Sequence, residues 1–174
     1  MSSELRVDKI VPTDGVPTGG GGGIVQVKQF TLTNTANGGF LMSTSSSSFT
    51  ATPLLLAITP KFSTSKVLVL VHQTYQIDNG SNDVQFQINM LLRDGSNNTL
   101  HGGLGYNALR WKNMISASNV YSLNFLHSPN TTSAFTYKMT MNYYYMSSGS
   151  GTLKAQRDDQ ANTQSEMTLM EVSA

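Results

Sequence analysis

The sequence predicts an all-β protein: an antiparallel β-sandwich, jelly-roll-like, with an extended N-terminal arm. Apolar and polar residues alternate with a period of two in many segments, whereas no segment sustains the 3.6-residue period of a helix. Gly, Pro, Asn and Asp separate these segments at short intervals, a pattern typical of antiparallel sandwiches and jelly rolls. The length of 174 residues suits one domain with an appendage.

The first 23 residues are expected to form an arm with a Gly-rich hinge, and residues 24–174 the β-sandwich domain. Four apolar residues of the arm can lie along one short extended segment: Leu5, Val7, Ile10 and Val11. Residues 12–23 then combine two prolines, an Asp-Gly bend and five consecutive glycines, which is hinge chemistry. Because this tract separates the apolar residues from the domain, we expect them to contact a neighbouring subunit.

Eight or more strands are expected within the domain. They lie at residues 24–32, 46–51, 54–59, 66–77, 84–93, 120–127, 135–146, 153–156 and 167–172. Pro53 is expected to separate the second strand from the third. Residues 66–77 give the strongest signal, because a near-continuous apolar start is followed by alternation at Tyr75 and Ile77.

Turns and facing side chains complete this pattern. Turns are expected at residues 78–83, 94–98 and 128–130, where Asp, Asn, Gly and Pro cluster. Alternation along residues 135–146 places five large side chains on one face: Phe135, Tyr137, Met139, Met141 and Tyr143. Residues 101–119 are less regular.

Composition narrows the function classes. Charged residues make up 12% of the chain and the net charge is +1, so the sequence gives no electrostatic case for binding nucleic acid or an acidic membrane. Ser, Thr, Asn and Gln together exceed a third of the residues, and uncharged polar side chains suit subunit interfaces. The absence of cysteine excludes disulfides, zinc fingers and thiol catalysis. Neither an apolar run long enough for a membrane helix nor a secretory signal is recognisable.

No catalytic residue, metal site or cofactor is predicted. The five glycines lack the Gly-Lys-Ser/Thr ending and the helix of a phosphate loop. The histidines, His72, His101 and His127, stand alone in sequence. Residues 78–83 are oxygen-rich and leave loose calcium binding open, although the distal Glu of an EF-hand is lacking. Asp158 and Asp159 with Glu166 are more typical of a solvated loop than of a catalytic pair. We therefore expect a non-enzymatic protein.

Aromatic residues are the candidates for partner contact within the domain. Tyr106 and Trp111 lie in the irregular stretch, and residues 143–145 are three consecutive tyrosines. Aromatic side chains are enriched at binding hot spots, while core filling is their commonest role. An aromatic shelf for a sugar is a second possibility. With the arm, the predicted contact residues are Leu5, Val7, Ile10, Val11, Tyr106 and Trp111.

Several segments together resemble structural proteins of tailed bacteriophages, notably cyanophage-like ones of aquatic hosts. The segments are the opening SSELRVDKIVPTDGVPTGGGGGIVQVKQ, the middle SSSSFTATPLLLAITPKFSTSKVLVLVHQTYQI, LLRDG at 91–95, and MTLMEV at 167–172. The resemblance implies a β-sandwich protein on the virion exterior, made in the host bacterial cytoplasm and assembled as a homotrimer. It implies a capsid decoration (cement) protein contacting the major capsid protein, or a tail-fibre component recognising host surface glycan. It carries no catalytic residues.

Overall fold

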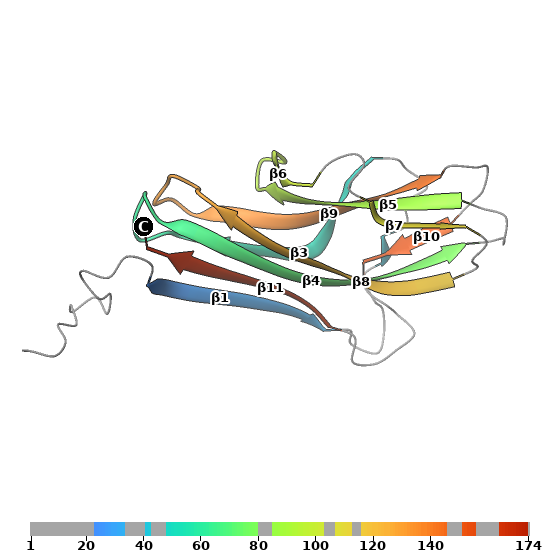
Figure 1. Cartoon of the computed structure of the whole chain (residues 1–174), viewed down its shortest axis with the longest axis horizontal. Helices are drawn as coiled ribbons and strands as arrows, with labels where there is room; N and C mark the ends of the chain where they lie inside the picture. Colours follow the sequence, from blue (N-terminus) through green and yellow to red (C-terminus); the bar gives the residue numbers. More distant parts are fainter. Residues whose placement is uncertain are drawn as a thin grey trace, which may run out of the picture.

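The computed structural model describes residues 23–33, 41–42, 48–79, 85–102, 107–112, 116–145, 151–155 and 164–173. These residues form strands, turns and bends, with no helix among them. The strands, labelled in Figure 1, are β1 (Ile24–Thr33), β2 (Leu41–Met42), β3 (Thr50–Ile58), β4 (Lys66–Asn79), β5 (Gln85–Asp94), β6 (Thr99–His101), β7 (Asn107–Lys112), β8 (Ser116–His127), β9 (Phe135–Tyr145), β10 (Gly151–Lys154) and β11 (Gln164–Val172).

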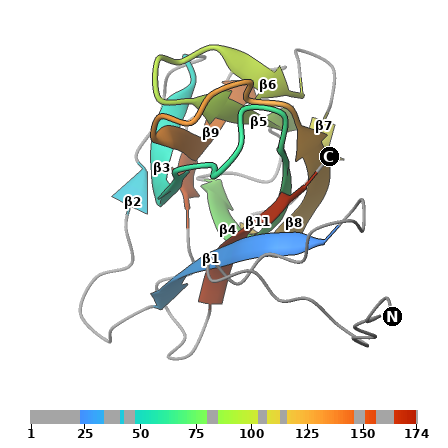
Figure 2. The same cartoon turned by 90° about the vertical axis from the view of Figure 1, so that its left-hand side faces the viewer.

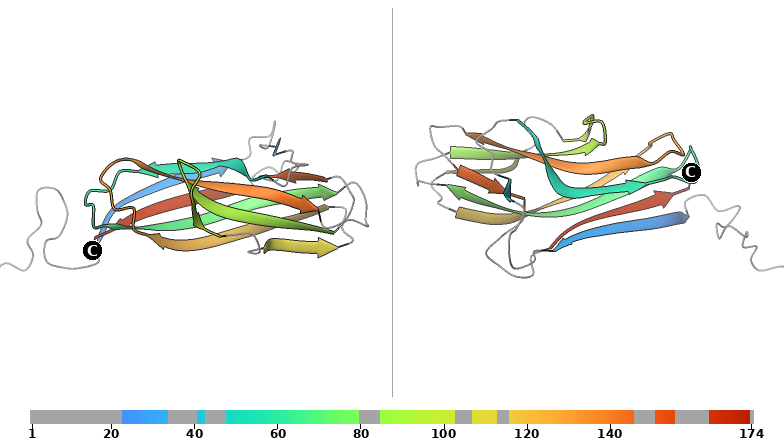
Figure 3. Two further views of the ribbon diagram at one scale, coloured as in Figure 1. Left: turned by 90° about the horizontal axis from the view of Figure 1, so that it is seen from above. Right: turned by 180° about the vertical axis from the view of Figure 1, so that it is seen from behind.

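Two antiparallel sheets face each other. In sheet A the order is β1-β11-β4-β10-β2, with β8 on the other side of β4. In sheet B the order is β3-β9-β5-β6, with β7 also paired to β5. The end-on view in Figure 2 shows the two layers, and Figure 3 shows that their strands run along the long axis of the body.

The strand order is that of a jelly roll. Strand β4 pairs with β11 along its first half and with β10 along its second, so β10 and β11 share one position in sheet A. Likewise β1 and β2 share the position beyond them, and β6 and β7 share the position beside β5. Counting the eight positions in chain order gives 1-8-3-6 for sheet A and 2-7-4-5 for sheet B. This order confirms the predicted all-β, jelly-roll-like sandwich.

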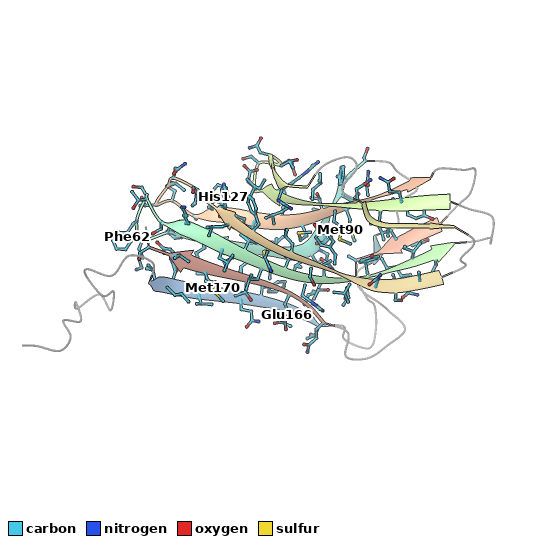
Figure 4. The ribbon with its side chains drawn as sticks, viewed as in Figure 1. Phe62, Met90, His127, Glu166 and Met170 are labelled. Atoms are coloured by element: carbon cyan, nitrogen blue, oxygen red, sulfur yellow. The ribbon has the colours of Figure 1, made fainter. Side chains whose placement is uncertain are left out.

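The core lies between the sheets and follows the predicted alternation. Tyr137, Met139, Met141 and Tyr143 of β9 are fully buried and Phe135 packs against them, as their spacing predicts. From sheet A, β4 contributes the inward residues of its apolar run: Val67, Val69 and Val71. Met90 of β5 lies between the layers in Figure 4. Truncating one such side chain to alanine typically costs about 2–5 kcal/mol.

A buried amide ties the two sheets together. Gln73 of β4 is fully buried, and Thr52 of β3 donates to its Oε1 at 3.3 Å. The Gln73 Nε2 donates to the carbonyl oxygen of Ala155 and to Ser165 Oγ. Ser165 also accepts from the backbone N–H of Thr74 at 3.0 Å. Because these groups satisfy one another, the polar residues are accommodated inside an otherwise apolar core.

Two strand boundaries differ from the prediction. Pro53 does not separate two strands; it lies within β3, where the register shifts between Ala51 and Leu55. Since β3 is at the edge of sheet B, a residue without an N–H is tolerated there. Strand β4 continues to Asn79, so Asp78 is a strand residue rather than the start of a turn. The irregular stretch also contains β7 and the beginning of β8.

The two shorter turns are confirmed. Asp94 caps the β5–β6 turn, accepting the N–H of Asn98 at 2.8 Å, and Asn97 adopts a φ of 72°. Asn130 in the β8–β9 turn adopts a φ of 52°. Asparagine tolerates this left-handed conformation better than most residues, which explains its use at both bends.

Candidate interaction surface

Strand β1 forms one edge of sheet A. It pairs with β11 from Ile24–Val172 to Thr33–Gln164, with a bulge between Ile24 and Gln26. Among the residues that the structure describes, β11 is the only strand paired with it, and Figure 1 shows it as the outermost strand. An open edge presents unpaired N–H and C=O groups to another chain. At ten residues, with Lys28 its only charged residue, β1 is a long edge with little protection.

A buried carboxylate holds β1 in place. Glu171 of β11 is fully buried, and its Oε2 accepts from Gln26 of β1 at 2.6 Å. Its Oε1 accepts the backbone N–H of Lys61 at 2.7 Å and of Phe62 at 3.3 Å, in the β3–β4 turn. Burial alone would raise the pKa of Glu171, but these hydrogen bonds outweigh it and hold the pKa below its usual range. Gln26 also donates to the carbonyl oxygen of Thr59. The carboxylate therefore joins the edge strand to the β3–β4 turn.

An apolar row crosses the outer face of sheet A. Its members are paired in register across four strands: Val27, Met170, Leu68 and Leu126. Alternation with the buried residues beside them turns these side chains away from the core, and Figure 4 marks Met170 on β11. Val27 is 53% exposed and Leu126 51% exposed. Ile24, 60% exposed, extends the row at the start of β1. A contiguous exposed apolar strip of this kind is typical of an interaction surface.

A shallow hollow adjoins the apolar row. It has a volume of about 240 Å³ and is lined by Leu70, Val71, His72, Ser122, Asn124, Glu166 and Thr168. Register places Glu166, His72 and Ser122 side by side on three neighbouring strands. Glu166 is labelled on β11 in Figure 4. The hollow offers a carboxylate, an imidazole, hydroxyls and an amide around a leucine, a set that can bind a polar partner through hydrogen bonds.

A ring cluster closes the opposite side of the sandwich. It joins β6, β8 and β9 through His101, Phe125, His127, Phe135 and Tyr137, with neighbouring ring centroids 5.0–6.0 Å apart. His127 Nδ1 lies 2.9 Å from the Tyr137 hydroxyl. Burial lowers the pKa of His127, although Asp94 opposes the effect, and burial raises the pKa of Tyr137. A neutral His127 packed among aromatic rings serves the structure of this side.

Of the six predicted contact residues, the structure describes Trp111 alone. Leu5, Val7, Ile10, Val11 and Tyr106 lie outside the described residues, so their contact role stays a prediction. Trp111 lies in β7, opposite Phe86 of β5. The outer face of sheet A was not predicted as a site. The signal was present in the unbroken apolar run of residues 67–71, because a strand apolar on both faces is typical of one covered on both sides.

The structure describes part of the oxygen-rich segment at residues 78–83, which the sequence left open as a calcium site. Asp78 accepts a hydrogen bond from Gln76 and lies 2.9 Å from Lys154 Nζ, whereas residues 80–84 lie outside the described part. Asp158 and Asp159 also lie outside it. Within the described ranges, no three His, Asp or Glu residues gather closely enough to hold a metal ion. No helix that could span a membrane occurs in that part of the chain.

Comparison with models of known protein families gave no match, and neither did comparison with curated proteins. Among solved structures, the chain is similar to that of infectious bursal disease virus, Gt strain, with 8% identity and a TM-score of 0.43 over 97% of this chain. The VP2 subviral particle of the same virus gives 7% and 0.43 over 86%, and the Gx strain 10% and 0.39 over 87%. The chain covers 44%, 40% and 32% of those chains, respectively, so it spans less than half their length.

Proposed function

We propose that this protein is a non-enzymatic structural component on the outside of a bacteriophage particle. The observation that carries the proposal is the apolar row Val27-Met170-Leu68-Leu126, which ends at the open edge of β1. An apolar strip across an uncovered sheet gains free energy when another protein covers it, at about 25 cal/mol per Å² of apolar surface removed from water. The sequence resemblance to virion proteins of tailed phages suggests that the partner is another protein of the particle.

Within that class, we favour capsid decoration. Such a protein acts mechanically: it buries area across neighbouring capsid subunits and raises the free energy needed to separate them. A standard interface buries roughly 1,600 Å² in total. Several contacts around a homotrimer reinforce one another, since each attached copy raises the effective concentration of the next. Residues 1–174 contain no heptads or repeats from which to build a fibre shaft, which supports this choice.

A tail-fibre or receptor-binding role is the second candidate. The hollow beside Leu70 favours it, because its hydroxyl, amide, imidazole and carboxylate groups can donate to and accept from the hydroxyls of a host surface polysaccharide. Quantitative mass spectrometry of purified particles separates the two. Hundreds of copies per particle support decoration, whereas tens or fewer support a tail position, and no copies contradict both.

The contact surface is tested with a matched pair of variants. Leu126→Lys places a charge on the apolar row, and Leu55→Lys places one on the outer side of β3 in sheet B. The wild-type leucines are almost equally exposed, at 51% and 49%. Attachment to particles that lack the protein should fall for Leu126→Lys and persist for Leu55→Lys. Equal attachment of both variants would show that the apolar row is not the contact.

A further inference from the structure

The open edge of β1 presents a distinct pattern on each of its faces. Val27 and Gln29 lie on the outer side, in register with Met170 and Thr168 of β11. Lys28 and Phe30 point to the other side, where Lys28 is exposed and Phe30 is 36% exposed. A strand that added to this edge would need an acidic residue for Lys28 and apolar residues for Val27 and Phe30.

The arm supplies that pattern within one short segment. Residues 5–11 read Leu-Arg-Val-Asp-Lys-Ile-Val. When Asp8 is set opposite Lys28 in a parallel register, Val7 falls opposite Val27 and Ile10 opposite Phe30. With the same Asp8–Lys28 pair in the antiparallel direction, Arg6 falls opposite Phe30 and Lys9 opposite Val27. The parallel register therefore pairs opposite charges with each other and apolar residues with each other, and both kinds of pair stabilise sheets.

Parallel pairing favours an arm from another molecule. In this register Val11 lies opposite Thr31, about 26 Å from Gly23 at 3.3 Å per residue. Within one chain, residues 12–22 would have to run back along the whole edge. Parallel neighbours normally need a crossover of a dozen or more residues, usually a helix, and these eleven include two prolines and five glycines. An arm from a second copy has no such constraint.

We propose that the open edge of β1 binds residues 5–11 of a second copy of this chain as an added parallel strand. The proposal rests on the proposed function and adds the surface that binds the N-terminal arm. The new strand satisfies backbone groups of β1, and Val7 continues the apolar row by one strand. Because arm and edge are different surfaces, the contact is heterologous and can close into a ring such as a trimer.

Charge reversal tests the register in the full-length chain. Asp8→Lys and Lys28→Asp should each weaken self-association by about tenfold or more, measured by light scattering, because like charges then face each other. The double variant Asp8→Lys/Lys28→Asp should recover most of the wild-type affinity. Asp8→Lys/Lys66→Asp is the matched control, since Lys66 is an exposed lysine on β4 of the same sheet. Equal rescue by both pairs, or no effect of the single variants, would overturn the proposal.

Cysteine pairing distinguishes the two molecules, because the chain has no cysteine of its own. Mixed Asp8→Cys and Lys28→Cys chains should form a disulfide-linked heterodimer under mild oxidation, while Asp8→Cys with Lys66→Cys should not. A third variant carries both Asp8→Cys and Lys28→Cys in one chain. If a disulfide formed only within this variant and never between chains, the edge would bind the chain's own arm and the proposal would be overturned. Cross-linked oligomers from a protein absent from purified particles would uphold this inference while refuting the proposed function. A particle-bound protein without cross-links would do the reverse.

Discussion

The outer faces of the two sheets follow the same alternation, but their outward side chains are buried to different extents. At the centre of sheet B, on β5 and β9, four outward residues are buried within the chain: Asn89, Leu91, Thr140 and Asn142 are 1%, 3%, 2% and 1% exposed. Asn89 Nδ2 donates to Asn142 Oδ1 at 2.8 Å, and Thr140 donates to the carbonyl oxygen of Leu91. On sheet A the corresponding positions carry the apolar row, which the chain leaves partly open. The centre of the sheet B face is covered within the molecule, whereas the apolar row on sheet A remains partly exposed.

Gly102 shows how the chain closes over sheet B. It follows β6 with a φ of +94°, and a Cβ at this position would lie 2.7 Å from the carbonyl oxygen of Met90 and 2.9 Å from Leu91 Cδ2. Only glycine allows the backbone to pass this close to β5. On sheet A, Leu68 is half-buried rather than buried. The difference implies that a charge placed on each face should destabilise the protein to very different extents.

Lysine substitution on the two faces is the strongest test of this comparison. Leu91→Lys buries an uncompensated charge and should cost about 3–5 kcal/mol of unfolding free energy, or prevent folding. Leu68→Lys should cost about 1 kcal/mol or less, because a half-buried lysine can extend its ammonium into water. Urea unfolding followed by circular dichroism gives both values. Similar losses for the two variants would show that both outer faces are covered to the same extent.

The buried carboxylate of Glu171, which holds the edge strand β1, gives the next largest expected change in stability. Glu171→Gln should cost about 1–3 kcal/mol, since an amide cannot accept all the hydrogen bonds that the buried carboxylate accepts. The folded-state pKa of Glu171 lies below its value of 4.5 in the unfolded chain. Its contribution is therefore complete above pH 4.5 and is lost as the pH falls through the folded-state pKa. Urea unfolding between pH 3 and 7 should show this loss in the wild type and little of it in Glu171→Gln. A parallel decline in both would exclude Glu171 as the source.

The ring cluster predicts a smaller loss in a different pH window. Burial holds the folded-state pKa of His127 below 6.5, so the unfolded chain takes up a proton first on acidification. Stability due to neutral His127 is present above pH 6.5 and falls as the pH drops toward the folded-state pKa. His127→Phe keeps a ring in the cluster and should remove this part of the profile. An unchanged profile between pH 6.5 and 5 would assign the titration elsewhere.

The alternation of residues along the sequence predicted the strands far better than it predicted the interaction surface on sheet A. The alternation of Phe135, Tyr137 and Met139 fixes their face because strand geometry is local. The apolar row depends instead on pairing between residues distant in sequence, as in Val27 with Met170, which no short segment encodes. Pro53 was misread for a related reason. A proline is tolerated at a sheet edge, and edge position is a property of the whole topology.

The smallest expected effect concerns the far end of sheet A. There Asp78 and Lys154 form an ion pair at 2.9 Å on the outer face, with side chains 38% and 15% exposed. Lys154→Gln should change the unfolding free energy by about 1 kcal/mol or less, because partly exposed pairs are screened by water and salt. It should leave particle attachment intact if the contact is confined to the apolar row. A large loss of attachment at unchanged stability would show that the partner covers the whole face, from the start of β1 to β10.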